Sequence, residues 1–285
     1  MRILLIGANG QLGTDLMKTL VGHELFPTTL ETLDITVMER VCETFQRVQP
    51  HAVINTAAYH AVDLCETKVM SALEVNAFGA RNLALAARET GSKLVHFSTD
   101  YVFEGNRSSP YTETDEPNPI SAYGISKLAG EKFLRYLWEK HFLIRTCGLY
   151  GHAGLEGKGM NFVENILQKA RAGQPLKVVH DQRVTPTSTR ELARKVTELI
   201  ETSYFGLYHI TSNGDCTWHE FAREIFAIEG IQAKLAPTTQ NEFNAPARRP
   251  AYSVLENARL KELGIDDLKP WQEALREYLA VRLRQ

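Results

Sequence analysis

Apolar and polar positions follow two alternating patterns through the first half of the chain. Short apolar runs rich in strand-forming residues predict strands at residues 2–6, 24–28, 52–55, 93–97 and 141–146. Between these runs, apolar spacings of three and four predict amphipathic helices at residues 11–20, 37–48, 69–90 and 122–140. Because parallel strands need helical crossovers, this alternation predicts an α/β fold with a doubly wound parallel sheet.

The second half of the chain changes character. Strands are predicted at residues 176–179 and 206–210, a helix at 217–229 and a closing amphipathic helix at 270–283. The glycine-rich stretch 151–159 and the stretch 237–250 are predicted to be irregular. We therefore expect the last strands of the sheet to be interleaved with a smaller, mixed C-terminal lobe. The sheet domain takes residues 1–149 and about 180–215, and the lobe takes about 150–179 and 216–285.

Composition narrows the classes of function. The 285 residues include 32 basic and 34 acidic side chains, and no basic cluster is longer than the pair Arg248 and Arg249. A net charge of −2 provides no field that draws the protein to nucleic acid or to an anionic membrane. No apolar run approaches the roughly 18 residues that span a bilayer. We expect a soluble, cytoplasmic protein with neither kind of partner.

The cysteines give no sign of a disulfide framework or a metal centre. All four lie far apart in the sequence, without a CxxC pair, at Cys42, Cys65, Cys147 and Cys216. This usage is typical of reduced, mostly buried thiols in a cytosolic protein.

Three glycines directly follow the first predicted strand and open the first predicted helix. Gly7, Gly10 and Gly13 have the spacing GxxGxxG rather than the commoner GxGxxG. Glycine lets the backbone turn sharply and approach a pyrophosphate, and the helix N-terminus offers unpaired N–H groups. This placement predicts a Rossmann-type dinucleotide-binding domain. An ordinary tight turn between strand and helix is the alternative.

The end of the second predicted strand bears on the choice of cofactor. Dinucleotide sites often place a carboxylate there for the adenosine ribose. Here the strand ends near Thr28, and the next acid is Glu31. The missing carboxylate leaves room for a 2′-phosphate, so NADPH is favoured over NADH, although no arginine stands nearby to bind that phosphate.

Tyr123 and Lys127 lie four residues apart on a predicted helix and therefore on one face. Reduction of a ketone requires a hydride at carbon and a proton at oxygen. A free tyrosine has a pKa of about 10, and an adjacent lysine ammonium would stabilise the phenolate and lower that pKa. The pair alone is also compatible with an ordinary surface tyrosine and lysine.

A strand-end threonine supports the catalytic interpretation. Thr99 follows the predicted strand 93–97, at the edge where open α/β sheets bind their ligands. Its hydroxyl can donate a hydrogen bond to a substrate oxygen and align it with Tyr123. Capping of a turn by a strand-end threonine is the alternative for this residue alone. Together, the glycine turn, Thr99 and the Tyr123–Lys127 pair predict a nicotinamide-dependent reductase of a small carbonyl substrate.

With these motifs in place, the sequence resembles the extended short-chain dehydrogenases/reductases and, within them, the dTDP-4-dehydrorhamnose reductase family. Matching segments span nearly the whole chain, at residues 7–13, 33–36, 55–59, 62–63, 75–76, 98–103, 123–124, 127, 130–131, 145–146, 181–182, 186–187, 206–209, 218 and 249–250. The resemblance implies NADPH- or NADH-dependent reduction of the 4-keto group of a nucleotide-linked 6-deoxysugar, dTDP-4-dehydro-L-rhamnose, to dTDP-L-rhamnose. The C-terminal lobe would then bind the substrate, and a monomer or a homodimer is expected.

The resemblance also implies roles for matching positions. The cofactor would be bound by Gly7, Asn9, Gly10, Gln11, Leu12, Gly13, Asp34, Ile35, Ala57, Ala58, Tyr59, His60, Asn76, Tyr123 and Lys127. The substrate would be contacted by Thr99, Asp100, Val102, Phe103 and Tyr123.

Alternatives stay open for three of the matching positions. Asn76 could simply satisfy backbone groups, Trp218 could belong to the core, and Arg145 could anchor a strand.

Two positions depart from the family pattern. Gly148 stands where the family usually has a tryptophan that packs against the substrate, and Val184 stands where it tends to have glycine. The substitution at Gly148 leaves the identity of the sugar nucleotide open. Some family members bind Mg²⁺ between subunits through carboxylates, and Asp15 is near one such place, but the sequence supports no metal site.

Two further functions compete with the reductase. An epimerase of the same superfamily would keep its cofactor bound and return the hydride. A non-catalytic NADP-binding subunit, resembling the regulatory subunit of methionine adenosyltransferase, would keep the fold without turnover. The set Thr99, Tyr123 and Lys127 favours catalysis.

Overall fold

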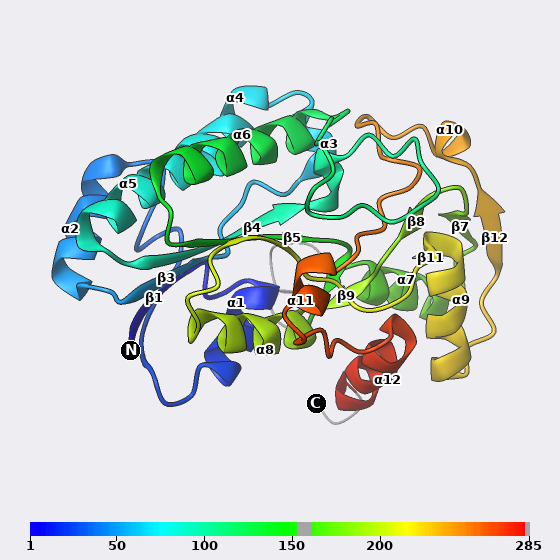
Figure 1. Cartoon of the computed structure of the whole chain (residues 1–285). Coiled ribbons are helices and arrows are strands. Elements are labelled where there is room, and N and C mark those ends of the chain that lie inside the picture. The colour runs from blue at the N-terminus through cyan, green and yellow to red at the C-terminus, as the bar shows by residue number, and fades with distance from the viewer. Residues whose placement is uncertain (153–160, 283–285) are drawn as a thin grey trace.

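A six-stranded parallel sheet forms the centre of the molecule (Figure 1). The computed structural model describes residues 1–152 and 161–282, so most of the predicted loop 151–159 lies outside the described residues. The strand order across the sheet is β10 (Gly206–His209), β5 (His141–Thr146), β4 (Lys93–Thr99), β3 (Ala52–Asn55), β1 (Arg2–Ile6) and β2 (Glu24–Thr28). Every pairing among these strands is parallel. The predicted α/β class is confirmed.

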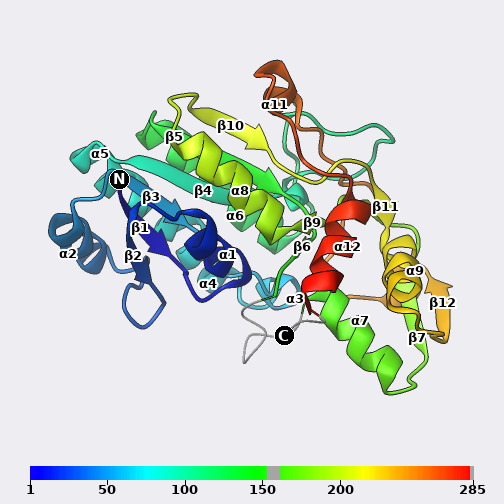
Figure 2. The same cartoon turned by 90° about the horizontal axis from the view of Figure 1, so that it is seen from below.

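Helices cover both faces of this sheet (Figures 1 and 2). Because successive side chains of a strand point to opposite faces, Leu4 and Ile6 of β1 join one core cluster while Ile3 and Leu5 join the other. The first cluster includes side chains of α2 (Met38–Val48), α5 (Ala80–Thr90) and α6 (Ala122–Leu137). The second includes α1 (Gln11–Thr19) and α8 (Thr189–Ile200).

A third core cluster lies beside the sheet and is built mainly by the second half of the chain. It includes side chains of α7 (Phe162–Arg171), β7 (Leu176–Val179), α9 (Trp218–Glu229) and α12 (Trp271–Arg282). Three small pairings complete this region: β12 (Leu235–Thr238) with β7, β11 (Cys216–Thr217) with β8 (Arg183–Val184), and β6 (Leu149–Tyr150) with β9 (Thr187–Ser188). The division into two lobes at the predicted boundaries stays a prediction.

Short helices occupy several connections. They are α3 (Val62–Cys65), η2 (Asp100–Val102), α10 (Gln240–Phe243) and α11 (Ala258–Glu262). The predicted irregular stretch 237–250 therefore contains α10 and the end of β12. Over the described part of the chain, no helix combines the length and the apolarity that crossing a membrane requires.

The predicted helix at residues 69–90 is not uniform. It consists of α4 (Val69–Leu73), a π-helical turn η1 (Glu74–Gly79) and α5. Such turns widen a helix locally and are frequent at functional sites.

The predicted helix 122–140 ends three residues early, at Leu137. Trp138 leaves the helix in an extended conformation, and its indole Nε1 donates to the Ser92 carbonyl at 2.8 Å. β4 in turn runs two residues beyond its predicted end and carries Thr99 within the strand.

Candidate active site

Four loops with most of the predicted site residues leave the sheet at one edge. Because β1, β3, β4 and β5 are parallel neighbours, their carboxyl ends face the same side. The glycine turn follows β1, residues 56–60 follow β3, Asp100 follows β4, and Cys147 and Gly148 follow β5.

The glycine turn leaves no space for side chains. Gly7 has φ +78°, and a Cβ atom there would lie 2.6 Å from Thr56 Oγ1. A Cβ atom at Gly13 would lie 2.3 Å from the Gly7 carbonyl oxygen. Gly10 is the N-cap of α1, and no side chain caps that terminus. A bare backbone at an uncapped helix N-terminus suits a pyrophosphate, so this turn fits a dinucleotide.

The side chains beside these glycines have other partners. Leu12 is 7% exposed and packs in the sheet core. The Gln11 Oε1 atom accepts hydrogen bonds from the Gly151 backbone N–H at 2.7 Å and from Asn161 Nδ2 at 3.1 Å. Gln11 and Leu12 would therefore contact a phosphate through their backbone N–H groups. The Gln11 side chain instead links α1 to the start of α7.

The predicted adenine-side residues form a fixed turn. Asp34 Oδ1 accepts from the backbone N–H of Thr36 at 2.9 Å and from its hydroxyl at 2.7 Å. Asn82 Nδ2 donates to the carbonyl of Ile35 at 3.1 Å. The Ile35 side chain is buried and faces Gly79.

Asn76 lies in the π-helical turn and holds the loop after β3. Its Oδ1 accepts from the Tyr59 backbone N–H at 2.9 Å, and its Nδ2 donates to the Tyr59 carbonyl at 3.0 Å and to Ser126 Oγ at 2.9 Å. With 1% exposure, Asn76 supports the segment Ala57, Ala58, Tyr59 and His60 from beneath. These bonds match the backbone role that stood as the alternative, and the direct contact of Asn76 with the cofactor stays a prediction.

Lys127 is buried beneath the start of α6. Ser121 caps this helix by accepting from the Gly124 backbone N–H at 3.2 Å. The Lys127 Nζ donates to the Phe97 carbonyl of β4 at 2.6 Å. Burial lowers the pKa of Lys127 to about 8, and the carboxylate of Glu131 opposes that shift.

Tyr123, one helical turn before Lys127, has an environment that keeps its proton. Burial raises its pKa above the ordinary value, and the negative charge of Asp100 adds to the rise, while a hydrogen bond with Thr99 opposes it. The Tyr101 ring lies edge-on to the Tyr123 ring, with centroids 5.9 Å apart. Lys127 is not among the groups that shift this pKa, and its Nζ donates to the Phe97 carbonyl, so the predicted lowering by the lysine stays a prediction.

A hydrogen bond joins Thr99 to Asp100, and a buried thiol also donates to Asp100. Thr99 Oγ1 donates to Asp100 Oδ1 at 3.0 Å and accepts from the Tyr101 backbone N–H at 3.1 Å. The Cys147 thiol donates to Asp100 Oδ2 at 3.1 Å. The predicted donation from Thr99 to a substrate oxygen therefore competes with a bond that its single proton already makes.

Val102 and Phe103 do not face the substrate edge, and their predicted contact with the substrate is wrong. Both are 0% exposed and belong to a core cluster with Tyr111 and Leu255. The Phe103 ring stacks on Tyr111 with centroids 4.1 Å apart. The short 3₁₀ turn after Thr99 directs both side chains into the interior.

Arg145 anchors a strand, as its alternative interpretation predicted. It forms a two-point ion pair with Glu131 of α6, with Nε–Oε1 2.9 Å and Nη2–Oε2 2.7 Å. Both side chains are 1% exposed. The pair ties β5 to the helix that carries Tyr123 and Lys127.

Gly148, the position that departs from the family pattern, adjoins a different tryptophan. It has φ +56°, and a Cβ atom there would lie 3.4 Å from Trp218 Cη2 and 3.2 Å from the Pro186 Cα. Trp218 is partly buried, and its ring lies 4.7 Å from that of Phe162. An aromatic side chain therefore stands beside Gly148, although it comes from α9.

A cavity of about 370 Å³ lies away from these residues, between α1, α8 and α12. Its lining includes Asp15, which accepts from Thr189 Oγ1 at 2.6 Å and pairs with Lys18 Nζ at 3.1 Å. Within residues 1–152 and 161–282, no three His, Cys, Asp or Glu side chains are placed to hold a metal ion. In this structure the two carboxylate oxygens of Asp15 accept from Thr189 and Lys18.

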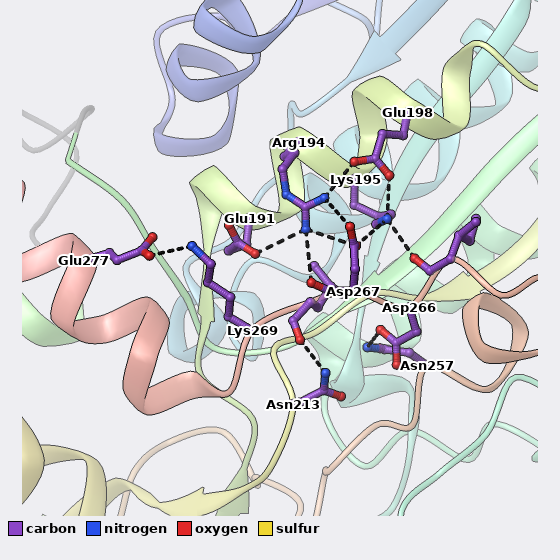
Figure 3. A network of polar contacts seen from close by, with 12 residues as sticks. Glu191, Arg194, Lys195, Glu198, Asn213, Asn257, Asp266, Asp267, Lys269 and Glu277 are labelled. Atoms are coloured by element: carbon purple, nitrogen blue, oxygen red, sulfur yellow. Dashed lines mark hydrogen bonds and ion pairs between the residues drawn. The ribbon is translucent and has the colours of Figure 1, made fainter.

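Figure 3 shows a network of charges, two members of which, Glu191 and Glu277, also line this cavity. Arg194 of α8 donates to Asp267 and Glu198 at 2.9 Å and 2.7 Å, and Lys195 Nζ donates to the Ile265 carbonyl at 2.7 Å. These contacts fix the segment after α11 to α8 and are structural.

Sequence reasoning missed two contacts near Tyr123. Arg249 Nη2 pairs with Asp63 Oδ2 at 3.1 Å, and its positive charge opposes the rise that burial causes in the pKa of Tyr101. The sequence predicts Cys147 only as a reduced thiol that is mostly buried, whereas in the structure it donates to Asp100. The position of Cys147 directly after a predicted strand was the one available signal.

Comparison with known proteins shows the family to which the chain belongs. Residues 1–283 match the family model described as RmlD substrate binding domain. The chain is 39% identical to the Bacillus subtilis spore coat polysaccharide biosynthesis protein SpsK, over 99% of this chain and 98% of that protein. The structure of a dTDP-4-dehydrorhamnose reductase from Clostridium acetobutylicum has a TM-score of 0.95 and 45% identity, with 100% of both chains covered. That of the Bacillus anthracis dTDP-4-dehydrorhamnose reductase, in complex with NADP, has a TM-score of 0.94 and 38% identity, with 98% of each covered.

Proposed function

Because the chain belongs to the RmlD family, to which dTDP-4-dehydrorhamnose reductases also belong, we propose that it is a nicotinamide-dependent reductase of a nucleotide-linked 4-keto-6-deoxysugar. The substrate that we propose is dTDP-4-dehydro-L-rhamnose, reduced to dTDP-L-rhamnose. One observation supports this proposal: the turn after β1, in which Gly7 and Gly13 leave no room for a Cβ atom, lies at the same edge of the sheet as the set Thr99, Tyr123 and Lys127.

The glycine turn and the loops beside it would hold the cofactor. The backbone of residues 7–13 suits the pyrophosphate, and the turn at Asp34 and Ile35 suits the adenine side. Residues 57–60, which Asn76 supports, would line the remaining groove. Bound there, a reduced nicotinamide supplies the hydride that adds to the carbonyl carbon of the sugar.

Tyr123 would supply the proton that the carbonyl oxygen takes up. Its raised pKa keeps the phenol protonated at neutral pH, which is the form a general acid needs. Lys127 lies one helical turn away and, with a pKa of about 8, is mostly cationic at pH 7. Its charge would stabilise the Tyr123 phenolate once the proton has left.

NADPH is the proposed hydride source. β2 ends at Thr28, whose hydroxyl donates to the Leu5 carbonyl at 3.3 Å, and no carboxylate stands at that strand end. The nearest acid in the sequence, Glu31, accepts a hydrogen bond from Thr29. We expect a higher kcat/KM with NADPH than with NADH, and Thr29→Asp should shift that ratio toward NADH.

The decisive experiment supplies dTDP-4-dehydro-β-L-rhamnose with NADPH and follows cofactor oxidation. Tyr123→Phe should lower kcat by about 10²–10⁴-fold, because it removes the general acid. The matched control is Tyr136→Phe on the same helix, where the side chain is 86% exposed and activity should be unchanged.

The outcomes separate the competing functions. Turnover of another nucleotide sugar alone would overturn the proposed substrate and leave the reaction class. NAD⁺ retained through purification, with no net cofactor oxidation, would indicate an epimerase. Equal activity in Tyr123→Phe and wild type would overturn the proposed chemistry.

A further inference from the structure

The short helix α3 joins the loop after β3 to the helix that carries Tyr123. Residues 57–60, which would line the cofactor groove, lead through Ala61 into α3, and Glu66 follows its last residue. Glu66 Oε1 accepts a hydrogen bond from the backbone N–H of Ala122 at 2.8 Å. Ala122 is the first residue of α6, and Tyr123 is the second. One side chain therefore connects the cofactor loop to the residue that precedes the candidate general acid.

The acceptor that Glu66 supplies is one that α6 does not provide. The first N–H groups of an α-helix have no acceptor within the helix. Ser121, the N-cap of α6, accepts from the Gly124 N–H at 3.2 Å rather than from Ala122. Because Glu66 lies 56 positions before Ala122 in the sequence, its bond is a tertiary contact that fixes where the helix begins relative to α3.

The first turn of α6 has further contacts that leave it little freedom. A Cβ atom at Gly124 would lie 2.2 Å from the Tyr101 carbonyl oxygen, so the helix backbone packs directly against the turn after β4. One turn further along, Asn76 Nδ2 donates both to the Tyr59 carbonyl at 3.0 Å and to Ser126 Oγ at 2.9 Å. Together with the carboxylate bond at the helix start, this amide joins the cofactor loop to α6 at two points.

We propose that Glu66 is a positioning residue that sets the place of Tyr123 relative to the cofactor. This inference rests on the proposed function for its kinetic consequence, whereas the bond between Glu66 and Ala122 exists without substrate. Hydride must reach the carbonyl carbon and a proton its oxygen, so the nicotinamide and the Tyr123 hydroxyl have to meet adjacent atoms. A misplacement of about 1 Å in such a geometry can cost about 10²-fold in rate.

The acceptor oxygen of Glu66 carries this role, and its charge does not. Glu66 is not among the groups that shift the pKa of Tyr123. A neutral amide oxygen at the same place can accept the Ala122 N–H equally well in geometry. Glutamine should therefore replace Glu66 in function, whereas alanine should not.

The kinetic test compares Glu66→Ala with Glu66→Gln. The glutamine keeps an acceptor for the Ala122 N–H, whereas the alanine leaves that N–H without one. We expect Glu66→Ala to lower kcat at least about tenfold, with KM and the Kd for NADPH within about twofold of wild type. Glu66→Gln should stay within about twofold of wild type in all three. Wild-type kcat in Glu66→Ala, or an equal loss in both variants, would overturn the proposal.

A solvent isotope effect distinguishes positioning from a general loss of structure. A misplaced Tyr123 slows the proton transfer itself, so kcat of Glu66→Ala should show a larger solvent isotope effect in D₂O than kcat of wild type. The matched control is Glu242→Ala, which removes a carboxylate acceptor from the Thr239 backbone N–H at the start of α10. This control should leave kcat and the isotope effect unchanged. An isotope effect in Glu66→Ala equal to that of wild type would overturn the proposal.

Amide exchange at Ala122 needs no turnover and so separates this inference from the proposed function. Measured by NMR on ¹⁵N-labelled protein, the Ala122 N–H should exchange slowly in wild type and Glu66→Gln, and at least about tenfold faster in Glu66→Ala. The Gly124 N–H, which Ser121 accepts, is the internal reference and should keep its rate. This difference would support the bond even if the sugar were not reduced. Equal exchange at Ala122 in wild type and Glu66→Ala would overturn the proposal even if the sugar is reduced.

Discussion

The Glu131–Arg145 ion pair joins α6 to β5 directly beneath the candidate active site. Both side chains are 1% exposed, and the guanidinium meets the carboxylate through Nε at 2.9 Å and Nη2 at 2.7 Å. The third guanidinium nitrogen, Nη1, has no partner among the described residues. Glu131→Gln keeps the shape of the side chain but removes its charge, so a cation would remain buried without its counter-charge.

Removal of one partner from a buried pair costs about 3–5 kcal/mol in the free energy of unfolding. In a chain of this size, that loss corresponds to a fall in Tm of roughly 6–20 °C. The measurement is urea unfolding followed by circular dichroism, with thermal unfolding as a second probe. Replacement of both Glu131 and Arg145 by methionine should recover much of the loss, because no isolated charge is then buried.

The matched control applies the same substitution to an exposed pair. Glu256 pairs with Lys261 at 3.0 Å, with both side chains more than a third exposed (38% and 52%). Glu256→Gln should cost less than about 1 kcal/mol. If Glu131→Gln also cost less than that, the reasoning would be refuted, since the buried charge would have found another partner or water.

Three further predictions concern other residues of the edge. Burial lowers the pKa of Lys127 to about 8, so between about pH 8 and 10 the unfolded chain binds more protons than the folded one. The free energy of unfolding of wild type, measured by urea unfolding relative to Lys127→Met, should therefore rise by about 2–3 kcal/mol from about pH 8 to pH 10. A difference between the two proteins that does not change with pH would contradict this. Gly13→Ala places a Cβ atom 2.3 Å from the Gly7 carbonyl oxygen, so the turn must shift, and NADPH affinity by calorimetry should fall at least about tenfold; unchanged affinity would show that this turn does not bind the cofactor. Asn76→Ala leaves the Tyr59 backbone N–H unpaired and removes one donor from its carbonyl, which keeps the Cys65 thiol. It should lower the free energy of unfolding by about 1–3 kcal/mol; no loss would mean that water replaces the amide.

Periodicity alone located the sheet. β1, β2, β3 and β5 begin and end at their predicted residues, because each is a short apolar run bounded by polar residues or turn-forming residues. The π-helical turn has no such signal. Glu74–Gly79 keeps the apolar spacing of a helix, and what widens it there involves contacts with distant residues, including those of Asn76 with Tyr59.

The site was predictable as a set of positions but not as a set of bonds. The strand ends placed Thr99 and Tyr123 together because parallel strands share an edge. The hydrogen bond from the Cys147 thiol to Asp100, for example, joins residues that are 47 positions apart in the sequence, so no local pattern predicts it. The predicted contact of Val102 and Phe103 with the substrate fails for a related reason. Their place next to Thr99 in the sequence does not tell which way the turn directs their side chains.

The strand order also determines how the chain can fold as it leaves the ribosome. β10 pairs only with β5 in the sheet, and α1 packs against α8, although β10 and α8 come late in the sequence. Until residue 209 has been synthesised, the outer edge of β5 is unpaired, and until residue 200 has been synthesised, the side of α1 that packs against α8 is uncovered. Nascent chains that end near residue 150 therefore expose a strand edge and a hydrophobic face, which are the features that chaperones protect from aggregation.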